Sequence, residues 1–206
     1  MVSHFDKVAQ NWDKNEVHAK RTKAIETEFR KSYEFNHGQI ALEFGAGTGL
    51  LSIALKDLFS EIILIDNSVE MVNVTKQKLI SENINNLQPI VFDLEKNDFT
   101  AKTFDVIFTQ MALHHVVDIE KILSKFHMML SHGGKLAIAD LYPEDGSFHD
   151  SDFNGHFGFN PEELSKTLVK LKFKGVNYKQ CFEIIKKDGP HQGKSYPIFL
   201  LTCNKK

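Results

Sequence analysis

Short apolar runs alternate with amphipathic stretches along most of this chain. After residue 38, continuous apolar runs predict five strands, at 40–44, 61–65, 87–92, 104–109 and 135–141. Such runs, rich in β-branched residues, are typical of strands buried on both faces of a parallel sheet. Segments with helical spacing separate most of them, at 50–59, 69–80 and 119–130. This alternation predicts an α/β fold with a doubly wound sheet and helices on both faces.

The two ends of the chain depart from this rhythm. Residues 3–33 show helical spacing of apolar side chains, and Asn36-His37-Gly38 ends that segment. Near the C-terminus, Asn160 and Pro161 are typical of a helix start, and we predict a helix over 161–171. Two strand-like runs follow, at 176–185 and 195–203, with no helix between them. We expect them to pair antiparallel at one edge, which makes a mostly parallel sheet of seven strands.

Length and composition limit the classes of protein that fit. The 206 residues suit one structural domain, which we divide into an N-terminal helical segment (1–37) and a sheet-forming domain (38–206). The net charge of −2 lacks the basic character of a nucleic-acid binder. The two cysteines, Cys181 and Cys203, have no metal or redox spacing and are expected to be free thiols. No apolar run approaches the ~20 residues of a membrane span, and we expect a cytoplasmic protein.

A glycine-rich turn follows the first predicted strand and carries the most specific signal. It reads Glu43-Phe44-Gly45-Ala46-Gly47-Thr48-Gly49. Ligands of doubly wound sheets bind at the carboxyl ends of strands, and glycines let the backbone approach them closely. The G-x-G-x-G spacing differs from the G-x-G-x-x-G of dinucleotide sites. The Glu43 carboxylate would repel a pyrophosphate but suit an amine, so we favour a cofactor with nucleoside and amino-acid parts over NAD.

Two further carboxylates stand at the ends of predicted strands. Asp66 ends the second strand, where it can accept hydrogen bonds from both hydroxyls of a ribose. Asp93 follows the third strand and could accept a hydrogen bond from an adenine amino group, with Leu94 and Met71 on the faces of the ring. Because carboxyl ends of parallel strands meet at one edge, the acids predict a nucleoside site.

These features resemble the class I S-adenosylmethionine-dependent methyltransferases over roughly residues 38–142. The resemblance rests on Leu42–Leu50, Ile65-Asp66, Phe92-Asp93-Leu94 and Phe104-Asp105-Val106-Ile107-Phe108. It implies a Rossmann-like methyltransferase fold, with S-adenosylmethionine as cofactor and S-adenosylhomocysteine as its product. The cofactor-binding residues that it implies are Glu43, Gly45, Ala46, Gly47, Thr48, Gly49, Asp66, Asn67, Ser68, Met71, Asp93, Leu94, Gln110 and Met111.

The opening segment is similar to a narrower group. His4–Asp13 looks like the F-D-x-x-A-x-x-aromatic-D opening of the ubiquinone/menaquinone-biosynthesis C-methyltransferase-like branch, and Ala112–Val116 is likewise similar. In such enzymes the opening segment lies over the cofactor. The resemblance therefore implies that residues 1–37 cover the cofactor site and that Trp12 contacts the cofactor; packing of Trp12 against the core is the alternative.

Candidate catalytic residues follow the fourth predicted strand. Methyl transfer from a sulfonium is an in-line displacement, so the protein mainly aligns the reactants and excludes water. A general base is needed only if the acceptor must lose a proton, and His114 and His115 are the candidates. Residues 144–160, with their four phenylalanines, are predicted to form a lid or an acceptor-binding segment. Within it His149, Asp150, Asp152 and His156 match no metal-ligand spacing, and we predict no metal site.

The expected function is methyl transfer from S-adenosylmethionine to a small-molecule acceptor. No Asn-Pro-Pro-Tyr run follows the fourth strand, where Thr109–Ala112 stands instead, and this disfavours a nucleic-acid acceptor. The acceptor atom and the oligomeric state stay open. The alternatives are a non-catalytic S-adenosylmethionine-binding protein and, less favoured by the turn, an NAD-dependent oxidoreductase.

Overall fold

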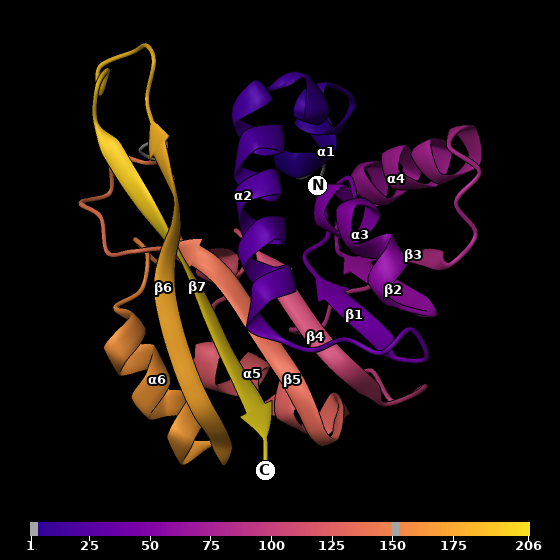
Figure 1. The fold of residues 1–206 in the computed structure, drawn as a ribbon. Helices are drawn as coiled ribbons and strands as arrows, with labels where there is room; N and C mark the ends of the chain where they lie inside the picture. The colour runs from indigo at the N-terminus through magenta and orange to yellow at the C-terminus, as the bar shows by residue number, and fades with distance from the viewer. Residues whose placement is uncertain (1–3, 150–152) are drawn as a thin grey trace.

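The computed structural model describes residues 4–149 and 153–206, which form one seven-stranded sheet with the order β3-β2-β1-β4-β5-β7-β6 (Figure 1). The first five strands run parallel, and β7 pairs antiparallel with both β5 and β6. The predicted α/β fold and its antiparallel end are confirmed. The strands are β1 (Ile40–Phe44), β2 (Glu61–Asp66), β3 (Leu87–Val91), β4 (Phe104–Gln110), β5 (Leu130–Leu141), β6 (Phe173–Ile185) and β7 (Ser195–Lys205).

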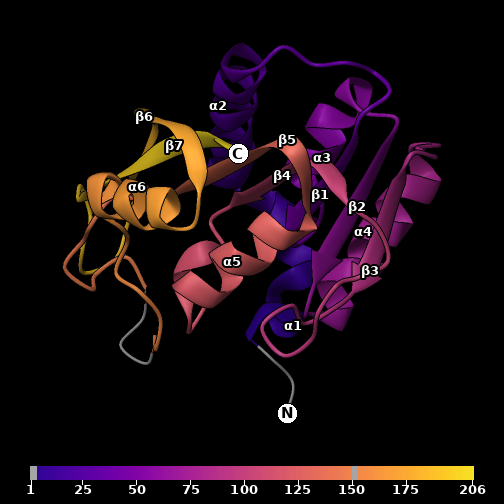
Figure 2. The same ribbon diagram turned by 90° about the horizontal axis from the view of Figure 1, so that it is seen from below.

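Helices cover both faces of the sheet (Figure 2). Side chains of α2, α3 and α4 join one buried apolar cluster, and those of α5 and α6 join a second cluster on the opposite face. No helix in the described part of the chain is long and apolar enough to cross a bilayer. The helical elements are α1 (His4–Val8), η1 (Ala9–Lys14), α2 (Glu16–Ser32), α3 (Leu50–Leu55), η2 (Lys56–Leu58), α4 (Val69–Ser81), η3 (Leu113–His115), α5 (Ile119–Met129) and α6 (Pro161–Lys170).

Polar side chains fix where several helices begin. Ser68 caps α4 by accepting a hydrogen bond from the Met71 N–H, and Asn160 caps α6 with Pro161 at its first position. Each cap satisfies one of the unpaired N–H groups at a helix N-terminus. The predicted start of α6 is thereby confirmed.

The two largest departures from the predicted boundaries lie in the N-terminal helix and at the start of β5; smaller ones are β6, which starts at Phe173 and not at 176, and the helix predicted over 50–59, which is divided into α3 and η2. The expected helix over 3–33 is interrupted, because Asn15 has an extended backbone and its side chain caps α2 by accepting from the Val17 N–H. β5 starts at Leu130, directly after α5, so Gly133 and Gly134 lie inside the strand and do not end the helix. A register shift against β4 accommodates them.

The N-terminal segment is attached to the elements around the glycine-rich turn. The Asp6 carboxylate accepts a hydrogen bond from the Ser68 hydroxyl at 2.6 Å. The Asp13 carboxylate accepts one from the Thr48 hydroxyl at 2.6 Å and pairs with the Lys78 ammonium at 2.7 Å. These contacts bring α1 and η1 against α4 and the turn after β1, so both aspartates of the opening motif have structural partners there.

Candidate functional site

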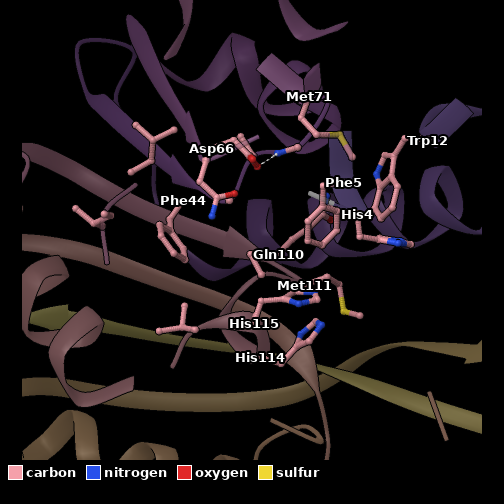
Figure 3. Close-up of a pocket in the computed structure, with 18 of the residues that line it drawn as sticks. His4, Phe5, Trp12, Phe44, Asp66, Met71, Gln110, Met111, His114 and His115 are labelled. Atoms are coloured by element: carbon pink, nitrogen blue, oxygen red, sulfur yellow. Dashed lines mark hydrogen bonds between the residues drawn. The ribbon is translucent and has the colours of Figure 1, made fainter. Parts of the chain in front are cut away.

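A cavity of about 520 Å³ opens at the carboxyl ends of the central strands. Its volume is in the range of about 300–1,000 Å³ that is usual for small-molecule sites. Asp66 and Met71 stand at one end, His114 and His115 at the other, and Gln110 and Met111 between them (Figure 3). The sequence-predicted residues that line it are Trp12, Gly45, Ala46, Gly47, Asp66, Asn67, Met71, Asp93, Leu94, Gln110, Met111, His114 and His115.

We call the part of the cavity bordered by Gly47, Asp66 and Asp93 the acidic end. The turn there needs glycine: Gly45 and Gly47 have φ angles of 65° and 54°, and a Cβ on Gly45 would collide with the Ala112 Cβ. The Asp66 carboxylate holds the turn by accepting hydrogen bonds from the Gly47 N–H at 2.7 Å and the Ser68 N–H at 2.8 Å. Burial raises the pKa of Asp66. At the acidic end, the backbone of Gly45 and Gly47, which carries no Cβ, therefore lies beside the Asp66 carboxylate.

Asp93 is more fully engaged in local contacts. Its carboxylate accepts hydrogen bonds from the Glu95 and Lys96 N–H groups and forms an ion pair with the Lys96 ammonium at 2.7 Å. Burial raises its pKa, but the bonds from Lys96 outweigh burial and leave the pKa below its ordinary value. Asp93 lines the cavity as an ionised group with part of its hydrogen-bonding capacity already used.

Four predicted cofactor contacts, Glu43, Thr48, Gly49 and Ser68, do not line the cavity. The buried Glu43 carboxyl lies behind the turn, where it accepts hydrogen bonds from the N–H and the hydroxyl of Ser52. Burial raises the pKa of Glu43 to about 8. Our sequence-based argument that its charge faces the ligand was therefore wrong.

The other three residues support the turn from outside. The hydroxyls of Thr48 and Ser68 donate to the aspartates of the N-terminal segment, as described above. Gly49, with a φ of 75°, starts α3 where a Cβ would press on Thr75. All three shape the turn without facing the cavity.

We call the part of the cavity bordered by His114, His115 and His149 the histidine end. His114 Nδ1 lies 2.6 Å from an oxygen of Asp140, and both side chains are buried. Because a carboxylate only accepts, the His114 ring donates its Nδ1–H to Asp140. The His115 ring lies 4.2 Å from that of His114, centre to centre. Burial, with the neighbouring histidines, lowers the pKa of His115 to about 3, so its ring is neutral.

Sequence reasoning missed several lining residues, of which Arg21 is the most informative. Its side chain is 5% exposed, its Nε has no hydrogen-bond partner, and it forms no ion pair within the described part of the chain. Burial lowers the pKa of Arg21 only to about 10, so it stays cationic. Ile25 and Phe29 form an apolar stripe on α2, and Arg21 and His18 lie on the same stripe towards the N-terminus. A positively charged residue on a buried stripe was the sequence signal that could have identified Arg21.

Trp12 and Met111 both line the cavity, whereas Tyr142 lies outside it. Trp12 lines the cavity and packs on the His18 ring at 4.2 Å. Met111, between the two ends, holds a left-handed φ of 53°, which is uncommon for a residue with a side chain. Tyr142, which directly follows β5, packs on Phe199 and does not line the cavity.

The predicted lid segment contributes unevenly. Phe148 and His149 line the cavity, and Phe153 stacks on the His149 ring at 3.7 Å. Phe159 packs against the core, whereas Phe157 is 47% exposed. Asp150 and Asp152, which we grouped with His149 and His156, lie outside the described residues.

Comparison with known proteins shows the family. The profile of a methyltransferase domain matches residues 42–138. An uncharacterized methyltransferase of Bacillus thuringiensis is 30% identical over 161 residues, which cover 71% of this chain and 69% of the relative. The chain belongs to the class I S-adenosylmethionine-dependent methyltransferases. S-adenosylmethionine is the cofactor of this methyltransferase.

Two further comparisons define the extent of the similarity. An uncharacterized methyltransferase of Schizosaccharomyces pombe is 30% identical over 139 residues, or 64% of this chain, and the matched part spans about half (46%) of that relative's length. A chain from the complex of the Haloferax volcanii Trm112 methyltransferase activator with a methyltransferase has a TM-score of 0.77 at 14% identity, covering 99% of this methyltransferase and 98% of that chain. The second similarity is one of fold alone.

Proposed function

We propose that this methyltransferase transfers the methyl group of S-adenosylmethionine to a small molecule bound at the histidine end of the cavity. One observation carries the proposal: a single cavity joins the acidic end to the histidine end, with Gln110 and Met111 at the junction. In the displacement, the bond between carbon and sulfur breaks, a bond from carbon to the acceptor forms, and sulfur keeps the electron pair. The cavity needs only to align the two reactants and exclude water.

The acidic end has the chemistry for the adenosine part of the cofactor. Asp66 would accept hydrogen bonds from the ribose hydroxyls, and Asp93 from the adenine amino group. Met71 and Leu94 are nearly fully buried yet border the cavity, so they offer apolar surfaces to the ring. The bare backbone from Gly45 to Gly47 leaves room for the methionine part to pass close by.

Arg21 would bind the cofactor's carboxylate. A buried guanidinium that forms no ion pair is costly in free energy, because it gives up hydration and the longer-range attraction of Asp140 does not replace a direct partner. The methionine part of the cofactor carries a carboxylate, which would supply a direct counter-charge. The unpartnered Arg21 Nε therefore supports a ligand whose anionic group enters between α2 and the turn.

The acceptor would lie against His114 and His115, which we propose as the catalytic residues. The Asp140 carboxylate fixes the orientation of the His114 ring, and burial lowers the pKa of His115 so that its ring keeps a lone pair. They could therefore promote loss of a proton from the acceptor. The N-terminal segment 1–37 and the segment 144–160 both place side chains along the cavity, which supports their roles as covers that exclude water.

The proposal is tested by binding and by turnover. S-adenosylhomocysteine should raise the melting temperature, because a ligand that binds only the native state stabilises it by mass action. Labelled S-adenosylmethionine should then yield a labelled product from a panel of small hydroxyl, thiol and amine compounds. Absence of a thermal shift at millimolar cofactor, with protein shown to be folded, would refute the cofactor site.

Binding and turnover assays together distinguish the proposed methyltransferase from a non-catalytic binding protein and from an oxidoreductase. Cofactor binding without methyl release for any member of the panel would favour a non-catalytic binding protein. A fluorescence change on adding NADH, together with no response to S-adenosylhomocysteine, would favour an oxidoreductase.

A further inference from the structure

The histidine end brings three imidazoles to one point, although they come from two separate segments. His114 and His115 belong to η3 after β4, whereas His149 belongs to the segment after β5. Each ring contributes one nitrogen, and these three nitrogens all lie within 4.8 Å of one another. All three line the cavity, so a species held between them would face the bound ligands.

The His114 ring is oriented as metal-binding histidines usually are. Its Nδ1–H donates to the Asp140 carboxylate at 2.6 Å, and Asp140 also accepts the N–H groups of His114 and Leu141. The Asp140 side chain is fully buried and thus rigidly placed. A carboxylate behind a ligating histidine fixes the tautomer and raises the basicity of the other nitrogen. Nε2 of His114 is left as the donor.

The other two rings are also suited to ligation. The His115 ring lies beside the His114 ring, 4.2 Å away centre to centre, so one ion could reach a nitrogen of each. His149 is fixed between two rings: Phe153 stacks on its face at 3.7 Å and an 8° angle, and Phe148 meets it edge-on at 4.8 Å. A tetrahedral ion with bonds of about 2.0–2.1 Å places its donors roughly 3.3 Å apart. The widest pair therefore needs to close by up to roughly 1.5 Å when an ion binds.

We propose that His114, His115 and His149 bind a divalent transition-metal ion of the zinc class, and that the methyl acceptor takes the open coordination position. Three imidazole nitrogen donors suit such ions, and a site with three protein ligands and one open position is typical of catalytic zinc. The ion's role in catalysis rests on the proposed methyl-transfer function, but its binding does not. The sequence spacing did not reveal the site, because the third ligand is 34 residues from the second.

The ion would explain how the histidines activate the acceptor. A hydroxyl or thiol that coordinates a divalent ion has a lower pKa and releases its proton to solvent. The oxygen or sulfur, now anionic, attacks the methyl carbon as the carbon–sulfur bond of the sulfonium breaks. The products are the methylated acceptor, S-adenosylhomocysteine and one proton, so atoms and charge balance.

Charge around the site is compatible with a cation. Asp140 contributes one negative charge directly behind His114. Arg21 opposes a cation there, since it is itself positively charged and interacts electrostatically with the same aspartate. A cofactor carboxylate on Arg21 would cancel that charge, so we expect the metal to bind more tightly when S-adenosylhomocysteine is present.

The test is metal binding itself. The metal-free protein is titrated with Co²⁺ and followed by visible absorption, and the Zn²⁺ content is measured after equilibrium dialysis. We expect one ion per chain and the intense absorption of tetrahedral cobalt. His149→Ala and His115→Ala should each weaken binding at least tenfold. His18→Asn is the matched control, because His18 also lines the cavity but bonds to the Trp12 carbonyl and lies outside the cluster; its metal affinity should be unchanged.

A positioning variant makes the test stricter. Asp140→Asn should weaken metal binding by about 10–100-fold, as is usual when the partner of a ligating histidine is lost. Folding of each variant is checked by its melting curve, and binding of S-adenosylhomocysteine is measured in the same samples. Protein that binds S-adenosylhomocysteine but takes up no metal, or that binds metal equally in His149→Ala, overturns the metal site alone. Protein that takes up metal but not S-adenosylhomocysteine overturns the proposed function alone.

Discussion

The two ends of the cavity are built in opposite ways. At the acidic end, each polar group follows the strand that positions it within a few residues: the turn follows β1, Asp66 ends β2, and Asp93 follows β3. At the histidine end, the ring of His114 depends on Asp140, 26 residues away, and Arg21 comes from a helix that precedes the sheet. A site built locally binds what the whole family binds, whereas a site built from distant segments can change its ligand without disturbing the fold.

The largest effect is expected from a substitution in the glycine-rich turn at the acidic end. Gly45→Ala places a side chain in the left-handed region and against Ala112, so we expect a loss of about 2–4 kcal/mol in the free energy of unfolding and loss of cofactor binding. Denaturant titration measures the first and calorimetry the second. Gly133→Ala is the matched control, because Gly133 has a similar φ of 74° with open space around it. An equal loss in both variants would mean that strain alone, not the contact with Ala112, matters.

Replacing Arg21 tests the residue that we propose for the cofactor's carboxylate. Arg21→Met removes a buried cation without a partner, so we expect stability to rise or stay constant while affinity for S-adenosylhomocysteine falls by about 1.5–3 kcal/mol. Calorimetry and chemical denaturation give the two quantities. Arg30→Met, on the same helix, should lower stability through its lost ion pairs with Glu26 and Asp57 and leave affinity unchanged. A variant of Arg21 with normal cofactor affinity would contradict the assignment.

Asp66 provides a graded test within the acidic end. Asp66→Ala should cost about 1–3 kcal/mol of cofactor affinity, because the ribose hydroxyls and the Gly47 N–H lose their acceptor. Asp66→Asn keeps one oxygen acceptor and should lose less. Isothermal titration with S-adenosylhomocysteine ranks the three proteins, and equal affinities would exclude contact with the ribose.

The smallest effect is a pH dependence from Glu43. Its pKa is raised from 4.5 to about 8, so the folded protein holds a proton that the unfolded chain has lost, and stability falls as pH rises between these values. The slope should approach about 1.4 kcal/mol per pH unit. His115, with its pKa lowered from 6.5 to about 3, has the opposite slope below pH 6.5. The measurement therefore belongs between pH 6.5 and 8, where Glu43→Gln should flatten the curve.

The sequence predicted the acidic end because its signals are local. Strand periodicity located β1, β2 and β4, and the residues at their carboxyl ends necessarily meet along one edge. The same reasoning wrongly placed the Glu43 carboxyl beside the ligand. Side chains alternate between the two faces along a strand, and the Glu43 carboxyl faces α3 instead of the cavity.

The histidine end could be predicted only in part. His114 and His115 could be predicted as site residues because they follow β4. Their sequence spacing did not show that they contact Asp140 or lie beside His149, because these contacts depend on the path of the chain through β5. Arg21 was hidden for a similar reason: a helix presents one face to the sheet, and which polar residue on that face meets a cavity depends on how the helix is docked.

The attachment of the N-terminal segment has a consequence for the speed of ligand exchange. Asp6 and Asp13 hold this segment to Ser68, Thr48 and Lys78, which flank the turn, and Phe5 and Trp12 of the same segment border the cavity. Separation of these contacts would open a route for the cofactor. We expect the double variant Asp6→Asn, Asp13→Asn to accelerate both arrival and departure of the cofactor more than it alters the equilibrium between them, so that the lifetime of the complex would depend on two aspartates that do not line the cavity.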